Sequence, residues 1–274
     1  MAPETTVDVL PEECLSTVLS FTCPRDTCSS AIVSGMFRSA SDSDLTWDKF
    51  LPADYRQIVA RSASPVDFAS KKELFAKLCS TPLLIDGGNK YKNTPSTFSV
   101  DKHTNKKCYM LSARELSITW STNSLCWCWK PFPHSRFGET AELITVCRLE
   151  IRGKINTQML SPNTTYGAYL VVQIANRAFG LSVLPSEVSV EVGDYKTRGK
   201  LYMNHEDGKR NEIDTSEGEE RVLCTRGDGW LEVELGEFYN GVGEKEVIME
   251  FKEVKSEHLK GGLIVEGIEI RPKY

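Results

Sequence analysis

Long hydrophobic runs are absent from this chain, and no stretch approaches the ~20 consecutive apolar residues that a membrane-spanning helix requires. The first twenty residues carry several carboxylates and no basic segment, so they do not resemble a secretory signal. We therefore expect a protein of the cytoplasm and nucleus that has no membrane partner.

A basic excess and catalytic motifs are also absent. The 33 Lys and Arg are outnumbered by 38 Asp and Glu, and no run of basic residues could follow a phosphate backbone, which argues against a nucleic-acid partner. The four histidines lie outside any nucleophile motif such as Gly-x-Ser-x-Gly, and the chain has no glycine-rich phosphate loop. The sequence therefore predicts no enzyme and no cofactor.

The cysteine pattern favours neither disulfides nor zinc. Nine cysteines, an odd number, are scattered along the chain without a Cys-x-x-Cys pair. Cys126 and Cys128 have strand spacing, but no nearby residues supply further metal ligands. We interpret the cysteines as reduced thiols and predict no metal site.

What the chain does have is a cluster of three tryptophans, Trp120, Trp127 and Trp129. Trp127 and Trp129 have the spacing that places both on one face of a strand. The polar residues 121–124 favour a turn that brings Trp120 back toward them. Such a cluster either fills a core or offers flat apolar faces to a ring-shaped ligand.

The periodicity of apolar residues changes near residue 95. From Leu10 to about residue 80 they recur at helical spacing, and Ser70 and Glu73 form a capping box for the last helix. Beyond residue 95 alternation favours antiparallel strands, whereas the polar segment 196–220 is expected to be a loop or an exposed hairpin. The main expected strands are 98–100, 108–111, 146–155, 166–174, 187–192, 231–235, 247–254 and 263–270.

The N-terminal run Leu10-Pro11-Glu12-Glu13-Cys14-Leu15, followed by Val18-Leu19 and by Trp47-x-x-Phe50-Leu51, resembles an F-box. The resemblance implies a helical hook that binds the Skp linker protein and, through it, the cullin scaffold of a ubiquitin ligase. The implied Skp-facing residues are Leu10, Pro11, Leu15, Val18 and Leu19, some of which also serve the core. The residues assigned to packing are Val33, Phe37, Trp47 and Phe50.

The C-terminal segment resembles the phloem protein 2 family, which includes the lectin Nictaba. The resemblance rests on motifs that recur in order: Ala113-Arg114-Glu115-Leu116-Ser117-Ile118-Thr119-Trp120, Trp127-x-Trp129, Asp228-Gly229-Trp230-Leu231 and Gly267-Ile268-Glu269-Ile270-Arg271-Pro272. It implies an antiparallel, jelly-roll-like β-sandwich lectin domain that binds glycans or glycoproteins containing N-acetylglucosamine.

The same resemblance suggests the site residues. Trp120 and Trp127 correspond to the rings tied to carbohydrate, and Glu246 corresponds to a carboxylate implicated in binding, although a solvated turn charge is the alternative for Glu246. Trp129 and Trp230 are expected in the core. A pyranose would stack its C–H face on the open rings.

Together the two resemblances predict a multidomain chain with a helical F-box at 5–52, a helical linker at 53–95 and a β-sandwich lectin domain at 96–274. They imply a non-catalytic substrate-recognition subunit of an SCF-type ubiquitin ligase. Two alternatives stay open: a lectin without a ligase role, and an F-box adaptor that recognises unmodified protein surfaces.

Overall fold

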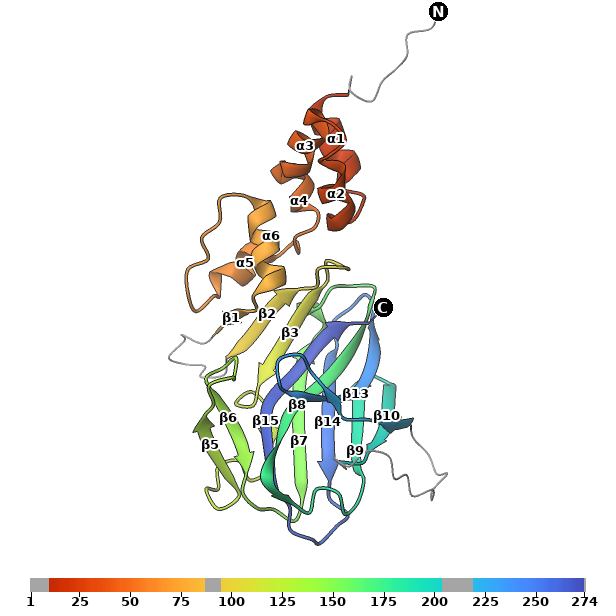
Figure 1. The fold of residues 1–274 in the computed structure, drawn as a ribbon. Helices are drawn as coiled ribbons and strands as arrows, with labels where there is room; N and C mark the ends of the chain where they lie inside the picture. Colours follow the sequence, from red (N-terminus) through yellow and green to blue (C-terminus); the bar gives the residue numbers. More distant parts are fainter. Residues whose placement is uncertain (1–9, 87–94, 204–218, 274) are drawn as a thin grey trace, which may run out of the picture. The chain divides into compact units, whose positions relative to one another are not determined.

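The computed structural model describes residues 10–86, 95–203 and 219–273. The chain divides into two compact units (Figure 1). The helical unit contains Met1–Ile85 and Phe98–Lys107, and the β unit contains Asp86–Thr97 and Cys108–Tyr274.

Six short helices build the helical unit. They are α1 (Glu12–Leu19), α2 (Pro24–Ser30), α3 (Gly35–Asp42), α4 (Asp44–Asp48), α5 (Tyr55–Ala60) and α6 (Lys71–Ser80). Leu15, Leu19 and Ala40 form a buried cluster of α1 and α3. Thr46 strengthens this contact because its hydroxyl reaches the carbonyl oxygens of Ser16 at 3.1 Å and Ala40 at 2.8 Å.

Residues 53–85 belong to this same unit and do not stand apart as a linker. Phe75 of α6 packs against Trp47 and Phe50, with ring centroids 5.3 and 6.4 Å away. The predicted capping at the start of α6 is present in modified form: the Ser70 hydroxyl accepts a hydrogen bond from the backbone N–H of Glu73 at 3.2 Å, and the Glu73 carboxylate accepts one from the N–H of Ala69 at 2.8 Å. The helices after residue 52 therefore extend the core of the first four.

The strands of the β unit form two sheets (Figure 1). The first contains β3, β15, β8, β13 and β12 in spatial order, with β6 paired to β15 and β5 paired to β6. The second has the order β11, β10, β9, β14, β7, β4, and only the β10–β11 pair is parallel. The bounds are β3 (Lys107–Ser112), β4 (Ser117–Ile118), β5 (Trp127–Pro131), β6 (Glu139–Leu143), β7 (Leu149–Asn156), β8 (Thr164–Phe179), β9 (Ser186–Val192), β10 (Tyr195–Leu201), β11 (Glu219–Arg221), β12 (Cys224–Thr225), β13 (Leu231–Asn240), β14 (Glu246–Glu253) and β15 (Gly261–Pro272). Two further strands, β1 (Leu83–Ile85) and β2 (Ser96–Val100), precede them.

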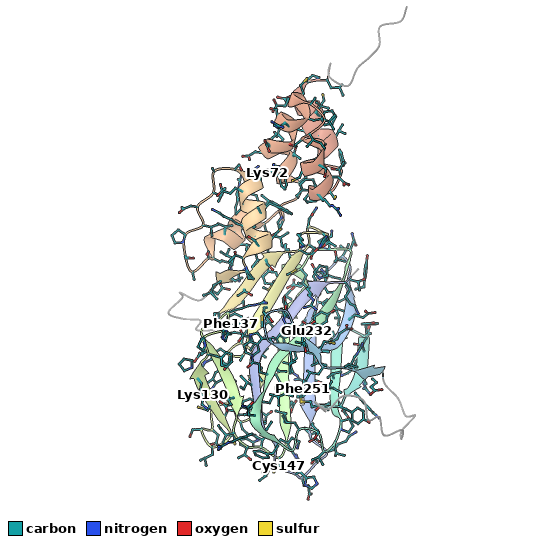
Figure 2. All side chains as sticks on the ribbon, in the orientation of Figure 1. Lys72, Lys130, Phe137, Cys147, Glu232 and Phe251 are labelled. Carbon is teal, nitrogen blue, oxygen red and sulfur yellow. The ribbon has the colours of Figure 1, made fainter. Side chains whose placement is uncertain are left out.

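The two sheets of the β unit pack face to face around an apolar core. Phe251 of β14, labelled in Figure 2, and Ile268 of β15 are completely buried. Gly153 of β7 allows close approach of the sheets, since a Cβ there would lie 2.8 Å from Ile268 Cδ1. The predicted strand alternation thus produces a β-sandwich.

The polar segment 196–220, expected to be a loop or an exposed hairpin, begins as the second strand of a hairpin. Residues Tyr195–Leu201 form β10, which pairs with β9 over its whole length. Most of the rest of the segment, 204–218, lies outside the described residues. In the described part of the chain, no helix has the length and apolar character needed to cross a membrane.

Candidate functional site

The helical unit leaves several large apolar side chains exposed. Val18 and Phe21 lie at the end of α1, and Ile32 and Val33 lie in the turn after α2; Phe21 is 82% exposed and Ile32 is 86% exposed. A hydrogen bond between the hydroxyls of Thr22 and Thr27, 3.0 Å apart, ties the two segments together. We call Val18, Phe21, Ile32 and Val33 the apolar helical surface. Exposed apolar groups of this kind mark surfaces that bind a partner.

The residues expected to face Skp divide between core and surface. Leu15 and Leu19 are buried in the helical unit, whereas Leu10, Pro11 and Val18 are exposed. The assignment of Val33 to packing is wrong, because its side chain lies in a turn and is exposed. The remaining three residues assigned to packing, Phe37, Trp47 and Phe50, do contribute to it. The sequence did not identify Phe21 and Ile32 as surface residues. The available signal was that neither residue continues the apolar stripe of α1.

Trp120 is the open ring of the tryptophan cluster. It lies two residues after the end of β4, its side chain is 61% exposed, and its backbone has a φ of 64°. A bulky residue rarely adopts this left-handed conformation, and such strain is concentrated at functional sites. The turn that follows is closed by a hydrogen bond from Asn123 N–H to the Trp120 carbonyl at 2.9 Å. The ring is therefore presented to solvent on an ordered turn.

Trp127 holds the Trp120 turn but cannot provide a stacking face. Its ring is only 2% exposed, so a sugar has no access to it in this structure. Its indole Nε1 donates to the carbonyl oxygen of Thr119 at 3.0 Å, and Nε1 of Trp129 donates to that of Ser121 at 3.2 Å. The two indole N–H groups thus bind the carbonyls on either side of Trp120. We call this pair of hydrogen bonds the indole clamp.

Trp129 is half-buried, and a cation covers one face of its ring. The guanidinium carbon of Arg114 lies 3.6 Å from the ring centroid, which is a cation–π contact. Arg114 also donates to both carboxylate oxygens of Glu139, at 2.7 and 3.0 Å. These hydrogen bonds lower the pKa of Glu139, since they favour its charged form. Trp129 is therefore not a free platform either, whereas Trp230 lies in the core as expected.

Further exposed apolar side chains lie in loops, and in one case at a strand end, at the same end of the sandwich as Trp120. Those loops are tied together by the buried ammonium of Lys260, which pairs with Glu253 at 2.5 Å and reaches the carbonyl oxygen of Cys147, labelled in Figure 2. Thr119 joins them because its N–H bonds the carbonyl of Glu150 at 3.1 Å, near the start of β7. The exposed residues are Leu125, Ile144, Phe179 and Leu259. With Trp120 they make up what we call the Trp120 end.

Glu246 lies at the other end of the sandwich. It pairs with Asn156 at the last residue of β7, and its carboxylate forms an exposed ion pair with Lys154 at 2.8 Å. Six residues of extended strand separate Asn156 from Glu150 beside Trp120, or roughly 20 Å. One sugar ring cannot contact both Trp120 and Glu246. The structure therefore does not bring the three predicted sugar-binding residues into one site.

Comparisons with known proteins agree with the two-part sequence pattern. The phloem protein 2 family model matches residues 106–272. F-box protein PP2-B15 of Arabidopsis thaliana is 46% identical over 97% of this chain and 96% of its own length. F-box protein At2g02240 of the same plant is 44% identical, over 97% of this chain and 80% of that protein. F-box protein VBF, also from Arabidopsis thaliana, is 42% identical, over 97% of this chain and 99% of its own length.

The matches to these relatives extend over both units, and the comparisons indicate no enzyme family. Their names refer to an F-box, and the family model accounts for the β-rich C-terminal part. The chain belongs to the plant F-box proteins of the phloem protein 2 B type.

Proposed function

We propose that this protein is the substrate-recognition subunit of an SCF-type ubiquitin ligase. The helical unit binds the Skp linker protein, and through it the cullin scaffold. The β unit binds glycans or glycoproteins that contain N-acetylglucosamine. The chain supplies no catalytic residue of its own; it raises the local concentration of target lysines near the ubiquitin-loaded enzyme. All nine cysteines are free thiols, and reduced thiols are compatible with a protein of the cytoplasm and nucleus.

The observation that carries this proposal is the apolar helical surface. Val18, Phe21, Ile32 and Val33 are exposed on a unit whose core is already filled by Leu15 and Leu19. Apolar anchors at the centre of an interface supply most of its binding free energy. An apolar groove on a helical partner protein would cover these side chains and remove them from water.

Replacement of Ile32 by Glu in the full chain tests the ligase part. We expect Skp to co-purify with the wild type, and the dissociation constant to rise at least about 30-fold in Ile32→Glu, because a hot-spot residue contributes ~2 kcal/mol or more. Val242→Glu is the matched control, since Val242 is 91% exposed on the β unit. Failure of the wild type to bind Skp, or equal effects of the two variants, would contradict the ligase role.

The exposed Trp120 ring supports the glycan part of the proposal. A pyranose stacks its C–H groups on an aromatic face, and an ordered ring loses little conformational entropy when it binds. We expect the full-length wild type to bind N-acetylglucosamine oligomers on a glycan array, and Trp120→Ala to abolish that signal while the protein stays folded. A signal that persists in Trp120→Ala would move the sugar site elsewhere.

A second function is favoured by one observation. Leu125, Ile144, Phe179 and Leu259 are apolar and exposed at the Trp120 end, as in surfaces that bind unmodified proteins. An empty glycan array with folded protein would favour this F-box adaptor without sugar recognition. Sugar binding combined with no Skp binding would instead favour a lectin without a ligase role.

A further inference from the structure

A cavity of about 400 Å³ opens at the end of the β unit opposite Trp120. It lies where the turn between β9 and β10 meets the turn between β13 and β14, and residues after β7 complete it. Its volume is within the range of small-molecule sites. Its walls include Thr157, Val192, Tyr195, Tyr239, Asn240 and Lys245.

The inner wall of the cavity contains a buried amide. Asn240 is 3% exposed, and its Nδ2 donates to the carbonyl oxygens of Thr157 at 3.2 Å and Ser161 at 2.9 Å. These bonds use both N–H groups and fix the orientation of the amide. The other polar atom of this amide is the acceptor Oδ1. In the described part of the chain, no side chain donates a hydrogen bond to it. The cavity wall thus has an ordered acceptor for a ligand donor.

The rim of the cavity carries two aromatic rings and a lysine. Tyr195 and Tyr239 are more than half exposed, although both line the cavity. The Lys245 ammonium has no ion-pair partner in the described part of the chain, and its stem lies beside Gly193. The carboxylate in the wall, Glu237, is neutralised by Lys273 at 2.8 Å, which also lowers the pKa of Glu237. Among the described residues, Lys245 therefore places a cation without a carboxylate partner at the opening.

We propose that this cavity binds a small anionic ring compound. The ring stacks on the exposed tyrosines, its anionic group pairs with Lys245, and a hydroxyl or amide N–H of the ligand donates to Asn240. The site lies beyond the last residue of β7, roughly 20 Å along that strand from Trp120, so it is separate from the proposed glycan platform. The ring of this ligand is either an aromatic ring or a sugar ring, and the experiment distinguishes these two classes of ligand.

The test uses two pairs of probes. Within each pair, one member carries an anionic group that the other lacks. The aromatic pair is 1-anilinonaphthalene-8-sulfonate and N-phenyl-1-naphthylamine, and the sugar pair is D-glucuronate and D-glucose. We expect the full-length protein to bind the anionic member of one pair at a saturable single site. Lys245→Met weakens that binding about tenfold and leaves the neutral member unchanged, because a charge-assisted hydrogen bond is lost.

Two further variants locate the site. Lys154→Met removes an equal charge from the nearby outer face, where Lys154 pairs with Glu246, and changes neither probe more than about twofold. Tyr195→Ala weakens the charged and the neutral member alike, since stacking is lost for both. No saturable binding in either pair, or equal affinities of wild type, Lys245→Met and Tyr195→Ala, would overturn the proposal.

Discussion

The helical unit and the β unit differ in which of their apolar side chains are buried and which are exposed. On α1, Leu15 and Leu19 are buried while Val18, on the same short helix, is exposed. On the strands of the sandwich, alternation directs apolar residues such as Val233 and Leu235 inward, and most exposed apolar residues lie in the loops. A helix of two turns cannot bury its whole surface in a small unit, whereas two facing sheets can.

This difference indicates two kinds of recognition. The helical unit offers several apolar side chains, which suits a protein partner with a complementary apolar groove. At the Trp120 end, the Trp120 ring stands on a hydrogen-bonded turn, which suits a ring-shaped ligand, and four further exposed apolar side chains lie at the same end. Two tryptophans of one cluster therefore differ in their surroundings: Trp120 is open to solvent, whereas Trp127 is buried and supports the Trp120 turn.

Alanine variants at the two tryptophans are expected to give the largest contrast. Trp127→Ala lowers the free energy of unfolding by about 3–5 kcal/mol, because it leaves a cavity in the core. Trp120→Ala changes it by less than about 0.5 kcal/mol, because its ring is exposed. Denaturant unfolding of the two full-length variants measures the difference. Equal losses of stability would show that Trp120 also belongs to the core.

A smaller effect is expected when Trp127 keeps its bulk but loses its N–H group. Trp127→Phe breaks half of the indole clamp, and we expect the affinity for N-acetylglucosamine oligomers to fall about fivefold, equivalent to ~1 kcal/mol for one hydrogen bond. Trp230→Phe is the matched control, since its Nε1 bonds the carbonyl of His134, away from the Trp120 turn. Titration of both variants tests the clamp. A similar loss of glycan affinity in both variants would mean that general destabilisation, and not the indole clamp, causes the effect.

The smallest effect is expected at Glu246. Glu246→Gln removes an exposed ion pair with Lys154, which changes stability by less than about 1 kcal/mol. Glycan affinity at the Trp120 end is expected to stay within about twofold, because the carboxylate lies at the far end of β7. Calorimetric titration with tri-N-acetylchitotriose provides the measurement. A tenfold loss would mean that sugar binds near Glu246 and not at Trp120.

Much of the fold was predictable because it depends on local patterns. The strand 231–235 alternates cleanly, and β13 begins at Leu231 as expected. The start of α6 was predictable because its two capping hydrogen bonds span only a few residues: the Glu73 N–H donates to the Ser70 hydroxyl, and the Ala69 N–H donates to the Glu73 carboxylate. For the segment that begins with the strand at 195–201, the sequence left a loop and an exposed hairpin open, because its side chains are mostly polar; the pairing with β9 decides its conformation.

The candidate site was less predictable. Spacing shows that Trp127 and Trp129 share a face of β5, but it does not show what covers that face. Arg114 covers Trp129 and is held by Glu139, and both residues lie on other segments of the chain. Likewise, Glu246 is close to a turn in sequence, while its distance from Trp120 depends on the direction of β7.

The sequence by itself determined the two-part organisation, the family, the main helices and strands, and the importance of the tryptophan cluster. These follow from residue types and periodicities that act over a few residues. Only the tertiary structure decided that Trp120 is open while Trp127 is buried, that Val33 is exposed, and that Glu246 lies at the opposite end. Exposure and distance depend on segments remote in the sequence, because packing buries one side chain by bringing others against it.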